Sequence, residues 1–317
     1  MGRWHEPRVT AATRRRSLLI HRSVALAAAW FAASAGTMGE PSARAAPAPA
    51  AKTLDYSRAQ HFVLSLINRD RESAGLSPVV LDEDAANAGL RHARDMAASG
   101  FTGHVGSDGS VPEQRYTASG GNHFVQENAA CLSDGVKRKL DERPRFEAVK
   151  LAALHDMFMA ERPPNDGHRR NILNPLHNRV GVGLAQSADV RQPCLAQEFV
   201  DKYGEYEALP RETKRGAKLH VAGTVSKPLV FGGVGIGRIP PREPSSGGPY
   251  RIPAPDTMYF SARFKTPKPV KVDGPHFSID LDLEKAVPSG NYALSIWAKR
   301  PDSKELFMIS MRTITVR

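Results

Sequence analysis

The sequence predicts an α+β fold, in which helices and strands follow one another without a regular β-α-β order. Three segments between residues 56 and 161 repeat apolar residues at helical spacing, and two segments after them alternate as strands do. From residue 208 onward, only short strand-like segments occur, separated by Pro, Gly and Asp turns. We therefore expect layered helices and strands in the first part and an all-β structure in the second.

The first 45 residues have the features of a cleaved export signal. Arg14–Arg16 and Arg22 form a basic region, and Ser23–Ala35 is an apolar stretch shorter than the ~20 residues that span a bilayer. Ala43–Ala45 is a small-x-small cleavage site. We expect an exported protein (periplasmic, envelope-associated or extracellular), with a flexible Ala/Pro-rich leader over residues 46–55.

Length and charge divide the remaining chain into two expected domains, residues 56–207 and 208–317. Residues 46–207 hold 19 basic and 22 acidic side chains, whereas residues 208–317 hold 18 and 9, a net charge of +9. This basic part favours an anionic envelope polymer or lipid head groups as a partner. A lysine-rich surface that only confers solubility is the other interpretation. We expect no nucleic-acid partner.

The chain contains only two cysteines, Cys131 and Cys194. An even count in an exported protein predicts one disulfide bond. Neither cysteine lies in a CxxC arrangement, so a catalytic or metal-binding thiolate is the weaker alternative.

The expected helices have recognisable ends. The first covers Tyr56–Ala74, with Phe62, Leu66 and Arg69 on one face, and Gly75 ends it. The remaining elements of this part are a helix from the N-cap Asp82 to Gly100, a loop over Phe101–Gly121, an extended segment over Asn122–Leu132, and a helix over Phe146–Glu161.

The strands come later in the chain. Val180–Leu184 and Leu195–Phe199 alternate, and short strands then follow at the spacing of an Ig-like β-sandwich. Gly233–Gly237 lacks the spacing of a dinucleotide-binding loop, so we interpret it as a strand-turn feature. The C-terminal strands are expected at residues 219–221, 229–231, 259–264, 277–283, 292–298 and 306–316.

Four segments of the first part carry candidate site residues. They are FTGHVGSDGSVPEQR with His104, VQENAA with Glu127, FMAE with Glu161, and NDGHRRNIL with His168. Two imidazoles and two carboxylates suffice for zinc or another divalent metal with an open position, and His104 and His168 are the expected ligands. Without metal, the same four groups could act as general acids and bases.

The order of these motifs is similar to that of a known family. LINRDRESAGLSPVVLDEDAANAGLRHARDMAASGFTGH, then QENAA, GHRRNILNPLHNRVGVG and AQEFV resemble the CAP superfamily, which comprises cysteine-rich secretory proteins and bacterial SCP-like relatives. The resemblance covers Tyr56–Tyr206. It implies an α-β-α sandwich whose cleft holds two histidines and two glutamates, here His104, Glu127, Glu161 and His168, with His168 facing His104 after a Pro-Pro turn.

The fourth member has a competitor. Phe158 and Glu161 fit the family's aromatic-x-x-glutamate pattern, and Asp156 lies five residues earlier, about 140° around the helix. We prefer Glu161. The chain departs from the family where Gln126 replaces a glycine and Phe158 a tryptophan, and it lacks the many disulfides of animal members.

Other polar residues are expected to have lesser roles. Arg115 could line the cleft or only hold its loop. Four further histidines are expected to pack or lie in turns rather than contact the site, namely His92, His123, His155 and His177.

The resemblance implies two classes of function. In the first, the cleft binds a divalent metal and a small or lipidic ligand, and the basic β-sandwich attaches the protein to a surface. In the second, the protein is a metal-dependent hydrolase in which His104 and His168 hold zinc and Glu127 or Glu161 activates water. A third interpretation makes both domains interaction surfaces and the tetrad structural. No nucleophile elbow is visible, so hydrolysis would require a metal. Two histidines are fewer than the three protein ligands of most catalytic zinc sites, which favours binding.

Overall fold

The computed structural model describes residues 52–242, 250–261, 268–283 and 288–317. The export signal expected over residues 1–45 and the leader up to residue 51 lie outside these ranges. Thr53–Leu54 form strand β1, which pairs with β4 (Phe146–Glu147). The leader expected over residues 46–55 is therefore too long at its C-terminal end, because Leu54 is already buried in the fold. Within the described residues, no helix is long and apolar enough to cross a membrane.

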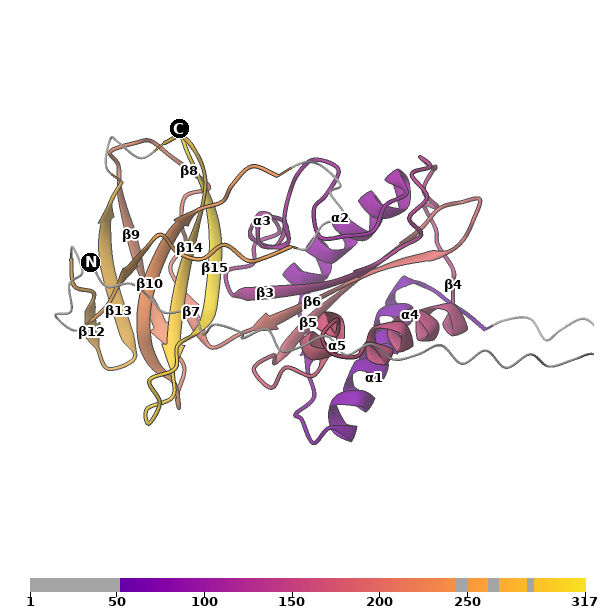
Figure 1. Ribbon diagram of the computed structural model, residues 1–317, viewed down its shortest axis with the longest axis horizontal. Helices are drawn as coiled ribbons and strands as arrows, with labels where there is room; N and C mark the ends of the chain where they lie inside the picture. Colours follow the sequence, from indigo (N-terminus) through magenta and orange to yellow (C-terminus); the bar gives the residue numbers. More distant parts are fainter. Residues whose placement is uncertain (1–51, 243–249, 262–267, 284–287) are drawn as a thin grey trace, which may run out of the picture. The chain divides into compact units, whose positions relative to one another are not determined.

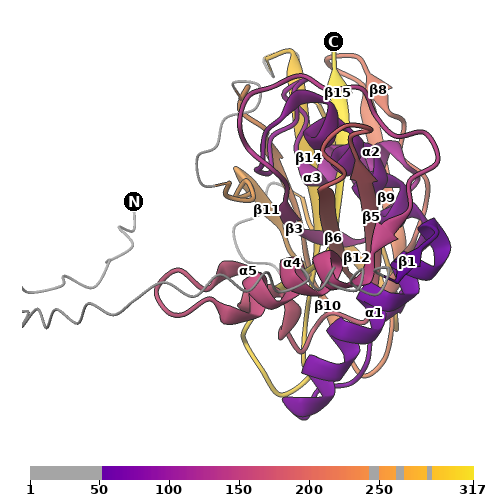
Figure 2. The same ribbon diagram turned by 90° about the vertical axis from the view of Figure 1, so that its right-hand side faces the viewer.

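The first part is an α-β-α sandwich, which confirms the predicted α+β class (Figures 1 and 2). Its sheet has the order β2-β5-β6-β3. Helices α2 and α3 cover one face, and α1, α4 and α5 cover the other. The strands are β2 (Val80–Leu81), β3 (Phe124–Ala130), β5 (Arg179–Gln186) and β6 (Pro193–Asp201). The helices are α1 (Tyr56–Ser73), α2 (Glu83–Ser99), α3 (Pro112–Ala118), α4 (Ala148–Ala160) and α5 (Gly167–Ile172).

Both central strands are buried on both faces. Every residue of β6, and every residue of β5 except Arg179, is buried. The sequence alternation in these strands therefore does not separate a core face from a solvent face, because helices cover both.

Helix α2 lies directly on the sheet because β5 has glycines beneath it. A Cβ at Gly181 would overlap the backbone of Ala85, and one at Gly183 would overlap the backbone of Gly89. The VGVG segment thus removes two side chains so that helix and strand backbones can touch.

The two long helices end as expected. Asp55 and Asp82 are the N-caps of α1 and α2, and their carboxylates accept from the amides of Arg58 and Ala85, both at 2.9 Å. Gly100 ends α2 at φ 68°, a left-handed conformation that favours glycine.

The short helices differ from the prediction. Helix α3 lies where we expected a loop over Phe101–Gly121, with Pro112 at its first position. Helix α5 contains His168, in a segment for which the sequence predicted no helix. Helix α4 begins at Ala148 rather than Phe146, because Phe146 pairs in β4.

The C-terminal part forms two sheets around one core. The five-stranded sheet has the order β11-β10-β14-β15-β8, and the four-stranded sheet has the order β12-β13-β9-β7. Val221 and Phe277 of one sheet share a core with Val234 and Ile296 of the other. The Ig-like type of this sandwich stays a prediction. The strands are β7 (Gly204–Tyr206), β8 (Glu212–Thr213), β9 (Lys218–Val225), β10 (Val230–Arg238), β11 (Thr257–Tyr259), β12 (Lys271–Asp273), β13 (His276–Asp282), β14 (Gly290–Lys299) and β15 (Phe307–Val316).

The four-stranded sheet begins before the boundary that we expected at residue 208, because β7 pairs with β9. Strand β15 also bonds to the first part: Ser310 Oγ donates to the carbonyl of Asn122 (2.5 Å), and the amide of Thr313 donates to Thr117 Oγ1 (3.2 Å). The two parts therefore share hydrogen bonds as well as a short connection. Residues 208–317 as an independent domain stay a prediction.

Candidate functional site

The four candidate residues line one cavity of about 730 Å³, which we call the His/Glu cavity. His104 comes from the loop after α2, Glu127 from β3, Glu161 from the C-cap of α4, and His168 from the start of α5. The other lining residues are Thr102, Gly103, Pro112, Val125, Gln126, Asn128, Ala129, Asn165, Gly167, Asn171, Tyr250, Arg251 and Ile252.

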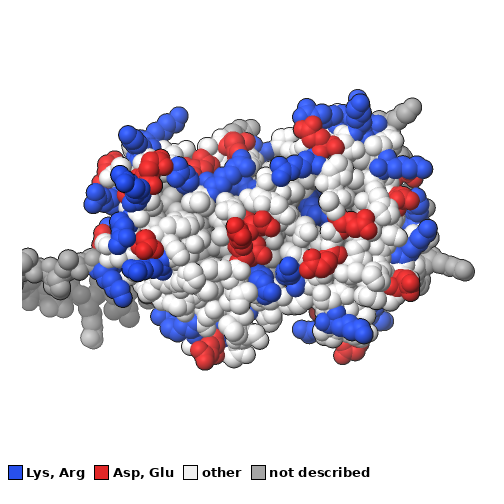
Figure 3. Space-filling view, turned by 180° about the vertical axis from the view of Figure 1, so that it is seen from behind, with Lys and Arg blue, Asp and Glu red and all other residues white. Residues whose placement is uncertain are grey.

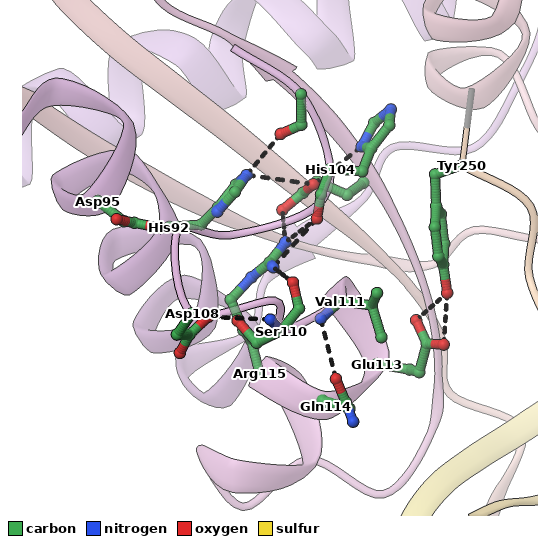
Figure 4. A network of polar contacts seen from close by, with 12 residues as sticks. His92, Asp95, His104, Asp108, Ser110, Val111, Glu113, Gln114, Arg115 and Tyr250 are labelled. Atoms are coloured by element: carbon green, nitrogen blue, oxygen red, sulfur yellow. Dashed lines mark hydrogen bonds and ion pairs between the residues drawn. The ribbon is translucent and has the colours of Figure 1, made fainter. Parts of the chain in front are cut away.

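Glu127 anchors one side of the cavity. Its Oε1 lies 2.9 Å from His104 Nδ1, and its Oε2 accepts from Arg115 Nη2 at 2.7 Å. Arg115 also donates to the carbonyls of His104 (3.1 Å) and Ser110 (2.8 Å), as Figure 4 shows. Arg115 therefore holds both the loop and the carboxylate, without being exposed in the cavity itself.

Glu127 is ionised in this setting. Burial alone would raise its pKa, but the charge of Arg115, the nearby His92 and the bond from His104 more than offset it and hold the pKa well below its usual range. An ionised carboxylate can only accept hydrogen bonds, so His104 must carry its proton on Nδ1. In the neutral form of the ring, the Nε2 atom of His104 is left with a lone pair.

Glu161 and His168 form a second pair. Glu161 Oε1 lies 2.5 Å from His168 Nδ1, and Oε2 accepts from the backbone amide of His168 at 2.8 Å. The ring of Phe158 lies 4.6 Å from that of His168, so the aromatic of the sequence motif supports the imidazole. Asp156 points elsewhere: its side chain is 66% exposed, 3.8 Å from Arg69. The geometry therefore places Glu161 in the cavity, while the role of the tetrad stays a prediction.

The two imidazoles face each other across 6.3 Å between ring centroids. Each Nδ1 is bound by its own carboxylate, and no hydrogen bond within the described ranges occupies either Nε2. Asn128 supports this side by donating to the carbonyl of His168 at 3.1 Å. When both rings are neutral, two Nε2 lone pairs are thus available to a ligand.

Glu198, a neighbour of Glu127 that does not itself line the cavity, is a residue that the sequence analysis missed. It is the cross-strand partner of Glu127 and is completely buried. No N–H group of the described residues donates to its carboxyl. Burial raises its pKa well above the usual range, and the negative charge of Glu127 raises it further, so Glu198 holds a proton. A glutamate in a strand that also holds Leu195, Phe199 and Val200 was a signal of a buried carboxyl, but the sequence does not show that it lies beside Glu127.

His92 also contacts the site, contrary to the expectation that it only packs. Its Nε2 lies 2.7 Å from the carbonyl of Gly103 and 3.7 Å from Glu127 Oε1. Burial lowers the pKa of His92, the main cause of its shift. The other three histidines lie outside the cavity: His155 bonds to Asp70, His177 bonds to Asp201, and His123 packs on Tyr206.

The donor set does not fit a hydrolytic zinc site. Within the part of the chain that the structure describes, no group of three or more His, Cys, Asp or Glu side chains is placed to hold a metal ion. Glu127 and Glu161 each bind the Nδ1 atom of a histidine through a carboxylate oxygen. Only the two Nε2 atoms are then left to bind a metal, whereas catalytic zinc has three protein ligands. The binding of zinc or another divalent metal by His104 and His168 stays a prediction. In this structure it would use only the Nε2 atoms of the two rings as protein ligands.

The predicted disulfide is confirmed. Cys131, just after β3, is bonded to Cys194 at the start of β6, and their Cα atoms are 4.3 Å apart. The bond joins the two strands that carry Glu127 and Glu198, next to the cavity.

Comparison with known proteins adds a family match. Residues 64–200 match the model of the cysteine-rich secretory protein family, CAP. The chain is 27% identical over 165 residues to the uncharacterized protein YkwD of Bacillus subtilis, covering 50% of this chain and 55% of that protein. It therefore spans about half the length of that curated relative.

Two solved structures are similar over less than half of this chain. One is an extracellular protein containing a SCP domain from Bacillus anthracis, with 21% identity, 46% of this chain, 41% of that chain and a TM-score of 0.35. The other is an outer surface protein from Borrelia burgdorferi, with 15% identity, 47% of this chain, 96% of that chain and a TM-score of 0.36.

Proposed function

Since residues 64–200 form a bacterial, SCP-like domain of the CAP family, we propose that the chain is an exported binding protein with its ligand in the His/Glu cavity. The ligand that fits is a small or lipidic molecule with a hydrogen-bond-donating head and an apolar body. The observation that carries this proposal is the pair of imidazoles. Each is hydrogen-bonded through Nδ1 to its own carboxylate, so that its Nε2 atom has no hydrogen-bond partner among the described residues.

The head group follows from the donors and acceptors beside the two rings. In neutral imidazoles both Nε2 atoms are acceptors, and ionised Glu127 and Glu161 are acceptors as well. A hydroxyl or ammonium head supplies the missing hydrogens, and a divalent cation could use the same two lone pairs. Beside the two rings, away from Arg251 of the lining, a carboxylate head would meet acceptors and a negative charge at Glu127, which is unfavourable.

The body of the ligand follows from the rest of the lining. Val125, Ala129, Pro112 and Ile252 give the cavity apolar walls. Its volume of about 730 Å³ is within the range of cavities that hold small molecules. Apolar surface buried there would supply the affinity, and the imidazoles would supply the selectivity.

The basic C-terminal part would attach the protein to an anionic envelope polymer. Its net charge of +9 supports this. On the face in Figure 3, however, basic and acidic side chains are interspersed. Attachment through such a surface should be weak and sensitive to salt, because exposed charges are screened over ~8 Å at physiological salt.

The test compares three probes that share one alkyl chain: decylamine, decyltrimethylammonium and decanoate. Calorimetric titration at pH 8 should give the tightest binding for decylamine, the only probe whose head donates hydrogen bonds. The His104→Ala/His168→Ala double variant should lose this preference, and His61→Ala, at an exposed histidine of α1, should keep it. Equal or tighter binding of decanoate by the wild-type protein would contradict the proposal.

A metal-dependent hydrolase is the alternative. It would need a third ligand from the substrate or solvent, since the described side chains supply two nitrogens. The geometry favours binding for this reason.

A further inference from the structure

Tyr250 brings the C-terminal part of the chain into the His/Glu cavity. It lies in the connection between β10 and β11, outside residues 64–200 that match the family. Its ring centroid is 6.1 Å from that of His104. Tyr250 and the next two residues, Arg251 and Ile252, line the cavity. One wall beside His104 therefore comes from a segment outside the residues that match the family.

Two contacts fix the Tyr250 ring. Its hydroxyl donates to both carboxylate oxygens of Glu113, as Figure 4 shows. The guanidinium of Arg242 lies over the ring, 5.0 Å from its centroid. The ring is thus held at its hydroxyl end and on a face, and it cannot rotate away from His104 without breaking both contacts.

The Glu113 carboxyl shows that this arrangement is more than packing between two parts of the chain. Glu113 is only 2% exposed, and within the described ranges it forms no ion pair with a Lys, Arg or His side chain. Burial raises its pKa, the largest cause of the shift. Burying a carboxyl is unfavourable unless a hydrogen bond compensates, and Tyr250 supplies that bond. An apolar contact would join the two parts without the free-energy cost of burying a carboxyl. The hydrogen bond between Tyr250 and Glu113, in addition, sets the orientation of the ring.

We propose that Tyr250 is a specificity-determining residue, through which the C-terminal part limits the space open beside His104. Glu113 is a positioning residue that acts through Tyr250. The ring admits an unbranched body and excludes a bulky polycyclic one. The choice of ligand body rests on the proposed binding function, but the limit on access to His104 does not.

Access is measured without any ligand. Diethyl pyrocarbonate acylates accessible imidazoles, and mass spectrometry of peptides gives separate rates for His104 and His168. Tyr250→Ala should raise the rate at His104 several-fold and leave that at His168 unchanged. Tyr292→Phe is the matched control, because it removes a tyrosine hydroxyl that bonds to the carbonyl of Pro288, within the C-terminal part.

Selectivity is measured with two amines, decylamine and 1-adamantylamine. Tyr250→Ala should shift the ratio of their dissociation constants about tenfold toward adamantylamine, since the ring contact is lost and space is gained. Glu113→Gln keeps an acceptor for the Tyr250 hydroxyl and should preserve the wild-type ratio. Glu113→Ala should shift the ratio in the same direction as Tyr250→Ala.

The outcomes separate the two proposals. If the wild-type protein binds neither amine, the proposed function fails. The acylation rates of His104 still test whether Tyr250 limits access to His104. An unchanged acylation rate of His104 in folded Tyr250→Ala would contradict the claim that Tyr250 limits access to His104. A faster rate with an unchanged ratio of dissociation constants would overturn the specificity role. A ratio shifted by Glu113→Gln as strongly as by Glu113→Ala would remove the positioning role of Glu113.

Discussion

At the scale of single residues, the site depends on how one buried cation shares its charge among buried carboxyls. Arg115 is bonded to Glu127, and the charges of Glu198 and Glu113 also act on it. One guanidinium cannot neutralise three carboxylates, so the structure leaves Glu127 ionised and a proton on Glu198. This division sets the tautomer of His104 and, with it, the chemistry that the cavity offers a ligand.

The first prediction concerns Glu198→Gln. The folded-state pKa of Glu198 lies above its unfolded value, so the folded protein holds a proton that the unfolded chain releases as pH rises past ~4.5. The contribution of Glu198 to wild-type stability should therefore fall across that rise, and Glu198→Gln, which is permanently neutral, should not show this loss. Urea unfolding at pH 5 and pH 8 measures the difference: the variant's advantage should be larger at pH 8.

Glu127→Gln is the control of opposite sign. The pKa of Glu127 is depressed, so its stabilising contribution is present above the unfolded pKa and is lost as pH falls. Glu127→Gln should therefore be less stable than the wild-type protein at pH 8. If Glu198→Gln were the more destabilising of the two at pH 8, the assignment of the proton to Glu198 would be wrong.

The tetrad positions could be predicted because the motifs that carry them have recognisable spacing. Glu198 and His92 could not, since their proximity to Glu127 depends on strand register and on the contact of α2 with the sheet. A pattern along the chain does not contain cross-strand neighbours. The packing of Phe158 against His168 explains why an aromatic precedes Glu161 at that spacing.

At the scale of elements, the contact between α2 and β5 decides where the site lies. Helix α2 carries His92 and leads into the His104 loop, so its distance from the sheet fixes how near His104 comes to Glu127. Gly89 and Gly183 bring the two backbones together at this crossing. Close packing of this kind tolerates no added carbon without movement of helix or strand.

The second prediction follows from that crossing. Gly183→Ala places a Cβ against the backbone of Gly89, which cannot move alone, so it should destabilise the protein by about 3 kcal/mol. Gly167→Ala is the matched control, because nothing lies within 4 Å of its Cβ position, and it should change stability by less than about 0.5 kcal/mol. Urea unfolding compares the two; equal effects would show that α2 is free to shift.

Long elements were predicted well, and short ones were not. Helices α1 and α2 have enough turns for periodicity and N-caps to appear in the sequence. Helices α3 and α5, of 7 and 6 residues, have too few turns for a repeating apolar face. The same holds for β8 and β12, whose 2 and 3 residues show no alternation.

At the scale of the whole molecule, the two parts of the chain depend on each other. The connection after β10 completes the His/Glu cavity, and β15 bonds to the ends of α3 and β3. The sequence did not predict this, because the segment around Tyr250 has neither helical nor strand periodicity. The contacts between the parts also bury a histidine, His123, which is 5% exposed.

His123 makes this junction sensitive to acid. Burial, together with the charges of Lys202, Arg179 and Arg312, lowers its pKa to about 4. Its ring packs against Tyr206, 5.6 Å between centroids, and the ring of Tyr206 also lies under Arg312. Its Nδ1 has no hydrogen-bond partner among the described residues. Protonation would therefore add a charge to a buried site that already faces cations.

The last prediction gives the direction of this acid sensitivity and the pH range in which it acts. The unfolded chain takes up the His123 proton near pH ~6.5, while the folded protein does so only near pH about 4, so stability falls as pH falls through this range. Each pKa unit corresponds to ~1.4 kcal/mol, so about 2–3 kcal/mol should be lost by pH 4.5 on account of His123. His123→Gln should remove this part of the loss in unfolding free energy, whereas His61→Ala, at an exposed histidine, should not. Urea unfolding of the three proteins at pH 7 and pH 4.5 measures it. Equal losses in all three would mean that the junction accepts a charged His123.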